Sequence, residues 1–190
     1  MNIITEEGPV ELNLSFFEEV EKRSGQPINA CYHCQKCSSG CPMAEFMDYA
    51  PNQILRMAQF GLKDRALRTS AIWVCSGCET CGVRCPNDIK ISEVMDTFSE
   101  IALEEGIPAK EKNIPIFHDV FLNSVRSNGR IHETFMMIGY KLKSGDLFSD
   151  IDVGIKMILK GKLPLLPGGG VKNKGEIKDL FNKVNELKKA

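Results

Sequence analysis

Apolar side chains recur at helical spacing through the middle of the chain. Pro51 suits the first turn of a helix, and Gly61 can end that helix in a left-handed conformation. A short helix is expected at Asp64–Arg68, and a longer one begins near Ser92, its expected N-cap, and stops at Gly106. The apolar stripe of this longer helix consists of Ile91, Val94, Met95, Phe98, Ile101 and Ala102.

The segments before and after this central region also carry apolar residues at helical spacing. Ser15 and Glu18 form a capping-box pattern for a helix that Gly25 ends. Further helices are predicted over 115–127, 131–143 and 151–160, and a last amphipathic stretch carries Ile177, Leu180, Phe181, Val184 and Leu187 on one face. Only residues 10–14 indicate a strand, and residues 163–170 are predicted to form an extended or turn segment. The fold class is therefore predicted to be mainly α.

Composition narrows the class of protein. The chain has 190 residues and a mass of 21.2 kDa, with 43% apolar and 26% charged residues, which suits one packed domain with an appendage. A net charge of −1 gives no general attraction to nucleic acid or to anionic lipid. No apolar run approaches the ~20 residues of a membrane helix. Because the first residues also lack a signal-peptide pattern, we expect a soluble, cytoplasmic protein with no membrane span.

All eight cysteines fall in two short runs of identical spacing. The runs extend from Cys31 to Pro42 and from Cys75 to Pro86, and each follows the pattern C-x2-C-x2-C-x3-C-P. Four disulfides are not expected in a reducing compartment. The spacing is that of ferredoxins, in which three closely spaced thiolates each bind a different iron of one cube. Two [4Fe–4S] clusters are therefore the predicted cofactors.

The fourth cysteine of each run follows the third too soon to close the same cube easily, and the proline after it redirects the chain. In two-cluster ferredoxins this fourth cysteine binds the other cluster. We therefore predict that one cluster is bound by Cys31, Cys34, Cys37 and Cys85. The other cluster is then bound by Cys75, Cys78, Cys81 and Cys41. This crossing would join the two halves of the module and bring the clusters close enough for electron exchange.

A structural zinc site is the alternative explanation of the cysteines. Such sites usually take two cysteines from each of two knuckles, which leaves the third cysteine and the x3-C-P of each run unexplained. No catalytic residue is predicted: no G-x-G-x-x-G opens a helix after a strand, and Gly168–Gly170 lacks the Gly-Lys-Ser/Thr of a phosphate-binding loop. Two cationic residues lie inside the loops, Lys36 and Arg84. Three roles are open for each: it raises the potential of a cluster, contacts a partner, or is a solvated charge.

The residues around the cysteines resemble a known family. Two such motifs carried on helices resemble the α-helical ferredoxin domain. More narrowly, the chain resembles the iron-sulfur C subunit of heterodisulfide reductase over nearly its whole length. The residues that carry this resemblance are the run from Cys31 to Ala44, then Met47, Asp48, Pro51 and Ile54, then Ile72–Cys75, and in the tail Gly129, Arg130, Gly139, Tyr140 and 160–167.

The resemblance implies an electron-relay subunit that belongs to an oxidoreductase complex and has no substrate site of its own. Its partners in that family are the flavin-carrying A subunit and the catalytic B subunit, which reduces the heterodisulfide of coenzymes M and B in methanogenesis. The complex associates with a hydrogenase or a formate dehydrogenase. The chain has no adjacent cysteine pair of the kind that the catalytic subunit requires. The alternative functions are a two-cluster subunit of another flavin- or quinone-linked oxidoreductase and, more distantly, a zinc-stabilised interaction protein.

The pattern divides the chain into three parts. Residues 1–25 are expected to form an N-terminal docking segment, 26–106 the two-cluster helical ferredoxin domain, and 107–190 a helical C-terminal extension for partner contacts. Residues 1–30 hold six acidic and two basic residues, whereas 161–190 hold seven basic and three acidic ones. This uneven charge indicates either two solvated faces or docking surfaces for different partners.

Overall fold

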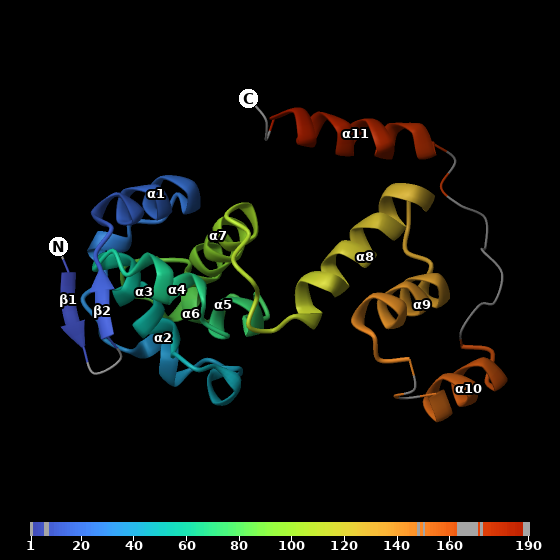
Figure 1. Ribbon diagram of the computed structural model, residues 1–190, viewed down its shortest axis with the longest axis horizontal. Helices are drawn as coiled ribbons and strands as arrows, with labels where there is room; N and C mark the ends of the chain where they lie inside the picture. Colours follow the sequence, from blue (N-terminus) through green and yellow to red (C-terminus); the bar gives the residue numbers. More distant parts are fainter. Residues whose placement is uncertain are drawn as a thin grey trace. The chain divides into compact units, whose positions relative to one another are not determined.

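The computed structural model describes residues 2–5, 8–147, 149, 151–162, 171 and 173–187. The extended segment predicted at 163–170 lies outside these residues. The chain divides into two compact units, Met1–Lys112 and Asn113–Ala190, which are described separately (Figure 1). Within the described ranges, none of the helices combines the length and the apolar character that crossing a bilayer requires.

The first unit begins with an antiparallel hairpin and continues as short helices that alternate with the cysteine loops (Figure 1). The strands β1 (Asn2–Thr5) and β2 (Gly8–Glu11) pair with Ile3 opposite Val10. The helices are α1 (Leu14–Ser24), α2 (Lys36–Ser39), α3 (Pro51–Gln59), α4 (Lys63–Leu67), α5 (Ala71–Val74), α6 (Thr80–Arg84) and α7 (Ile91–Glu104). Single 3-10 turns lie at Ile28–Ala30 and Ala44–Phe46.

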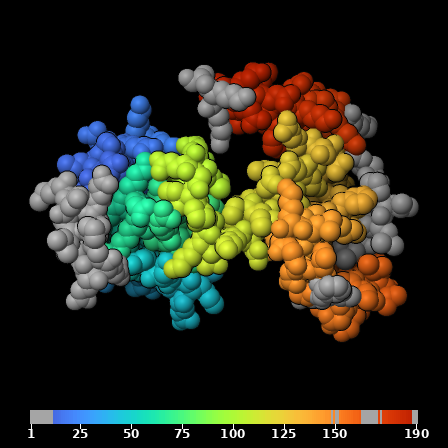
Figure 2. Space-filling view, viewed as in Figure 1, coloured from blue at the N-terminus to red at the C-terminus, as the bar shows by residue number. Residues whose placement is uncertain are grey.

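Helix α7 is the centre of the first unit and contacts α1, α3, α4, α5 and α6. In Figure 2 the yellow-green surface of α7 lies directly against the green surface of the preceding helices. Phe98 of α7 stacks on Phe16 of α1, with ring centroids 5.4 Å apart and both side chains fully buried. Burying two aromatic side chains in this way stabilises the contact by several kcal/mol, on the order of 3–5 for either ring. Helix α1 is thus packed into the same unit as the cysteine loops.

The described residues of the second unit form four helices: α8 (Asn113–Asn128), α9 (Glu133–Ser144), α10 (Ile151–Leu159) and α11 (Lys174–Leu187). Helices α8 and α9 pack together through Phe117 and Tyr140, whose rings meet edge to face at 5.9 Å. Gly139 permits this approach, because a Cβ there would stand 3.2 Å from Val120. These helices begin and end within one to three residues of the predicted ranges 115–127, 131–143 and 151–160, and the amphipathic stretch is α11.

The glycines that were predicted to end three helices are confirmed, but two predicted N-caps are wrong. Gly25, Gly61 and Gly106 all have positive φ directly after or near the end of a helix. The N-cap of α1 is Asn13, whose side chain accepts the N–H of Phe16 at 3.2 Å, while Ser15 lies inside the first turn and donates to Asn13 Oδ1. Asn and Ser are about equally good N-caps, so the local sequence did not decide between them.

The N-cap of α7 is Lys90, and Ser92 lies within the helix. Its hydroxyl donates to Glu79 of the second cysteine loop at 2.7 Å instead of capping the helix. The strand predicted over 10–14 is also displaced, because β2 ends at Glu11 and Leu14 already begins α1. At Ser92 a contact with another segment, rather than the local sequence, determines the partner of the side chain.

Candidate metal centres

The two cysteine loops have the same backbone conformation. His33 and Gly77 follow the first cysteine by two residues, and both have positive φ, 66° and 60°. Gln35 and Glu79 follow the second cysteine, and their φ values are 64° and 60°. Each then starts a short helix, α2 or α6, that carries the third cysteine. Left-handed residues placed before right-handed ones turn successive N–H groups toward one side, which forms a concavity suited to anions such as inorganic sulfide.

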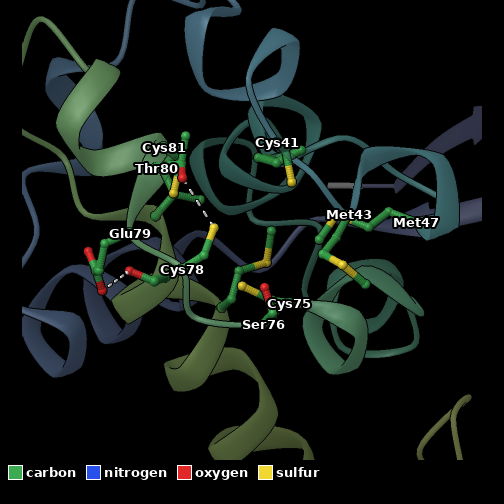
Figure 3. Close-up of a pocket in the computed structure, with 13 residues that line it drawn as sticks. Cys41, Met43, Met47, Cys75, Ser76, Cys78, Glu79, Thr80 and Cys81 are labelled. Carbon is green, nitrogen blue, oxygen red and sulfur yellow. Dashed lines mark hydrogen bonds between the residues drawn. The ribbon is translucent and has the colours of Figure 1, made fainter.

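The fourth cysteine of the first run lies with the first three of the second run. Cys41, Cys75, Cys78 and Cys81 all line one hollow (Figure 3). Its remaining wall is mostly apolar and includes Met43, Met47, Pro51, Ile91 and Met95. Cys78 Sγ lies 3.4 Å from Thr80 Oγ1, within the range of a sulfur hydrogen bond. The structure therefore brings together the four thiols that the crossed assignment gives to the second cluster.

Three of the other four cysteines act on Tyr32. Desolvation raises the pKa of the Tyr32 hydroxyl, and the negative charges of Cys34, Cys85 and Cys31 raise it further. Cys85, from the second run, is thus among the groups that act on a residue of the first loop. Cys37 is the most buried cysteine of this set, with its Sγ 3.8 Å from Ser38 Oγ.

Two hydrogen bonds tie the chain after Cys85 to the chain before Cys31. Asn87 donates its side-chain amide to the carbonyl of Ala30. The backbone N–H of Lys90 donates to Gln26 Oε1 at 2.9 Å. Because these contacts span more than fifty residues, they hold the second run beside the first.

The thiols are chemically suited to a cationic iron core. Burial raises the pKa of the Cys75 thiol, the N–H of Gly77 opposes this, and negative charge on Cys81, Asp96 and Cys41 raises it again. Burial likewise raises the pKa of the Cys37 and Cys81 thiols. Buried thiolates are unfavourable without positive charge nearby, and bound iron supplies that charge. The donor set and its apolar wall therefore fit [4Fe–4S] clusters.

Asp48 positions the start of the second loop. Its carboxylate accepts the backbone N–H groups of Ser70 at 2.7 Å and Ala71 at 3.0 Å, at the N-terminus of α5. Helix α5 ends at Val74, and Cys75 follows directly. Lys110 donates to the same carboxylate at 2.9 Å. Asp48 thus anchors the residues that lead into the second loop, a role that no local pattern indicated because its partners lie more than twenty residues away.

Asn52 plays a comparable part in the first loop. Ser38 Oγ donates to Asn52 Oδ1 at 2.5 Å and accepts the backbone N–H of Asn52 at 3.0 Å. The amide nitrogen of Asn52 lies 3.1 Å from Nδ1 of His33, which has positive φ. Helix α3 therefore supports the first loop at two points. Its apolar period was visible in the sequence, but this polar contact was not.

Across the described ranges, no three His, Cys, Asp or Glu side chains lie as close together as the ligands of one bound ion. Four thiolates around one zinc would each lie about 2.3 Å from the ion.

Comparison with known proteins identifies the family. Residues 27–89 match the family model described as a 4Fe-4S dicluster domain. The chain is 30% identical over 138 residues to the iron-sulfur C subunit of the CoB–CoM heterodisulfide reductase of Methanopyrus kandleri, a match that covers 68% of this chain and 72% of that protein. It is 32% identical over 143 residues to the second such C subunit of Methanocaldococcus jannaschii, covering 70% of this chain and 76% of that protein.

A third relative is described by the complex to which it belongs. It is the C subunit of the H(2):CoB-CoM heterodisulfide,ferredoxin reductase of Methanothermobacter thermautotrophicus, 32% identical over 98 residues, covering 52% of this chain and 53% of that protein. The first two relatives are named iron-sulfur subunits of a reductase, and the residues that match the 4Fe-4S dicluster model contain both cysteine runs. The chain belongs to the family of heterodisulfide reductase iron-sulfur C subunits, which makes it an electron-transferring subunit that works within a larger enzyme.

Proposed function

We propose that this chain relays single electrons, through two [4Fe–4S] clusters, from a flavin-carrying subunit to a catalytic subunit that reduces the heterodisulfide of coenzymes M and B. The observation that carries the proposal is the grouping of Cys41 with Cys75, Cys78 and Cys81 around one hollow. This grouping supports a crossed pair of clusters held in one unit, which electrons can traverse. Bound clusters accept and release one electron at a time with little rearrangement.

We assign the ligands as two crossed sets. The first consists of Cys31, Cys34, Cys37 and Cys85, and the second of Cys75, Cys78, Cys81 and Cys41. The hydrogen bonds that hold the chain after Cys85 beside the chain before Cys31 support the first set, and the shared hollow supports the second. In both loops the protein fixes the thiols through the same left-handed residues and through helices α3 and α7.

The exposure of the loops supports a relay rather than a substrate site. Cys34 and Cys78, the second cysteine of each run, are both exposed. Each cluster would therefore have one edge at the surface, where a partner subunit can dock within electron-transfer distance. Two large side chains within the cysteine runs are exposed as well, Tyr32 at 62% and Val83 at 86%.

We further propose that the helical second unit contacts partner subunits. Large apolar side chains on its helices are exposed, including Leu142, Leu159, Leu180 and Leu187. Partner subunits would cover this surface in a complex with the flavin-carrying and catalytic subunits and with a hydrogenase or a formate dehydrogenase. Free cysteines in the described chain fit a reducing compartment, so the proposed location is the cytoplasm.

Affinity purification from the native cell under anaerobic conditions tests the proposal. We expect the chain to co-purify with a flavoprotein and with a protein that carries paired-cysteine domains. The isolated chain, loaded with iron and sulfide, should not reduce the heterodisulfide with an artificial electron donor. Turnover by the pure chain, or purification with neither partner, would contradict the relay.

A further inference from the structure

The two cysteine loops differ in charge at one structurally equivalent position. Gln35 and Glu79 each follow the second cysteine of their run, each has positive φ, and each starts the short helix that carries the third cysteine. The backbone at both positions is the same within a few degrees, 64° and 60° in φ. The side chains differ only in that one is a neutral amide and the other a carboxylate. The two loops therefore place a neutral side chain and a charged side chain of the same length on the same backbone conformation.

Glu79 lies in the wall of the second metal site. It lines the same hollow as Cys41, Cys75, Cys78 and Cys81 (Figure 3). Its carboxylate accepts the hydroxyl of Ser92, a buried residue of α7, at 2.7 Å. This bond holds the charge beside the loop although the residue itself is exposed.

The charges within the two runs differ by this one carboxylate. Each run contains one cation, Lys36 in the first and Arg84 in the second, and Glu79 is the only acidic residue in either run. The second run is therefore more negative than the first by one charge.

We propose that the Glu79 carboxylate gives the cluster of the second site a lower reduction potential than the cluster of the first site, and so directs electrons from the second site to the first. This inference rests on the proposed relay and on the crossed ligand sets. The second site, which contains Cys78, is then the side that receives electrons from the donor subunit. The first site, which contains Cys34, is the side that passes them on.

The direction in which Glu79 shifts the reduction potential follows from the charge of the clusters. A [4Fe–4S] centre with four thiolates carries a net charge of about −2 when oxidised and −3 when reduced. A nearby carboxylate therefore destabilises the reduced form more than the oxidised form. In the transfer itself one electron leaves the second site, which is oxidised, and enters the first site, which is reduced. No bond forms or breaks, and no proton has to move.

Exchanging the two side chains tests the inference. Glu79→Gln removes the charge but keeps an oxygen that can accept from Ser92, and Gln already occupies the same backbone conformation at residue 35. We expect it to raise the lower of the two potentials by about 59 mV, a tenfold change in the one-electron equilibrium between the sites. The measurement is an EPR-monitored redox titration of the iron-loaded chain.

Gln35→Glu is the reciprocal variant and should lower the higher potential by a similar amount. Glu18→Gln, on the exposed side of α1, removes the same charge at a place that does not line the hollow. It should leave both potentials unchanged. A shift of the higher potential in Glu79→Gln, an equal shift of both, or no shift at all would overturn the inference. An effect of Glu18→Gln as large as that of Glu79→Gln would also overturn it.

Failure of the underlying relay is distinguishable from failure of this inference. A chain that holds fewer than two [4Fe–4S] clusters, by iron and sulfide content, overturns both. Two clusters whose potentials do not respond to Glu79→Gln overturn only the role of Glu79.

Discussion

The side chain of Arg84 lies across Gly40. A Cβ at residue 40 would stand 2.6 Å from Cζ and 2.7 Å from Cδ of Arg84. These two residues are equivalent in the internal repeat, because each directly precedes the fourth cysteine of its run, Cys41 or Cys85. The contact therefore joins the two loops at the point where their cysteines cross.

Gly40→Ala should force the Arg84 side chain away from this position. Residue 40 has a φ of −111°, so alanine meets no backbone penalty and the cost is the collision alone. We expect a loss of about 1 kcal/mol in the free energy of unfolding, and almost none when Arg84→Ala is already present. A double-mutant cycle by anaerobic unfolding measures this coupling. Strictly additive effects of the two substitutions would show that the side chains do not meet.

Gly61→Ala should destabilise the protein more than Gly25→Ala. Both glycines have positive φ, 67° and 64°, so each substitution costs about 1 kcal/mol or more in backbone strain. A Cβ at residue 61 would also collide with the backbone of Asn13, with its carbonyl carbon at 2.7 Å, whereas nothing lies within 4 Å at residue 25. We expect a total loss of about 3 kcal/mol for Gly61→Ala by anaerobic thermal unfolding. Equal losses for the two variants would contradict the packing of Asn13 on Gly61.

Asp48→Ala should loosen the segment that leads into Cys75. The substitution removes the acceptor for the N–H groups of Ser70 and Ala71 and costs about 1–2 kcal/mol, as for other helix caps. Asp48→Asn retains one acceptor oxygen and should lose less. The second cluster should also be lost faster in air than the first, as followed by EPR. Equal loss of both clusters would argue against a local role for Asp48.

The contribution of Asp48 should depend on pH. Burial raises the pKa of its carboxyl, but the N–H of Ser70, the Lys110 ammonium and the N–H of Ala71 together outweigh it, so the pKa lies below its ordinary value. The stabilisation is therefore complete above the unfolded pKa of about 3.9 and is lost as the pH falls through the folded pKa. The difference in unfolding free energy between wild type and Asp48→Asn should hold constant near neutral pH and shrink below about pH 4. A difference that grows on acidification would reverse the sign of this account.

Replacing the fourth cysteines separately tests the crossing. Cys41→Ser should perturb the EPR signal of the cluster bound by Cys75, Cys78 and Cys81, because Cys41 lines their hollow. Cys85→Ser is the matched variant and should perturb the other cluster. If each substitution instead changed the cluster of its own run, the ligand sets would not cross.

The sequence predicted the helices and their glycine stops because both depend on local properties. The apolar period of α7 and the left-handed glycines at 25, 61 and 106 are determined by residues close in the chain. The cysteine spacing predicts that Cys41 binds the cluster of the second run, and this assignment stays a prediction, which the position of Cys41 in the hollow of Cys75, Cys78 and Cys81 supports. The sequence was sufficient to predict features that depend only on residues close together in the chain.

Contacts between distant segments could not be predicted in this way. Ser92 turns to Glu79 of the second cysteine loop instead of capping α7. Asp48 reaches the start of α5, and Asn52 supports His33, across loops whose conformation the sequence does not encode locally. Each of these polar residues has several possible partners along the chain, and only the folded arrangement selects one.

Metal and sulfide analysis of the anaerobically purified chain tests the central claim most directly. Two [4Fe–4S] clusters predict about 8 iron and about 8 sulfide per chain, with a brown colour and no zinc. A colourless protein that contains zinc and no iron would contradict the electron relay and leave a zinc-stabilised interaction protein as the explanation of the eight cysteines.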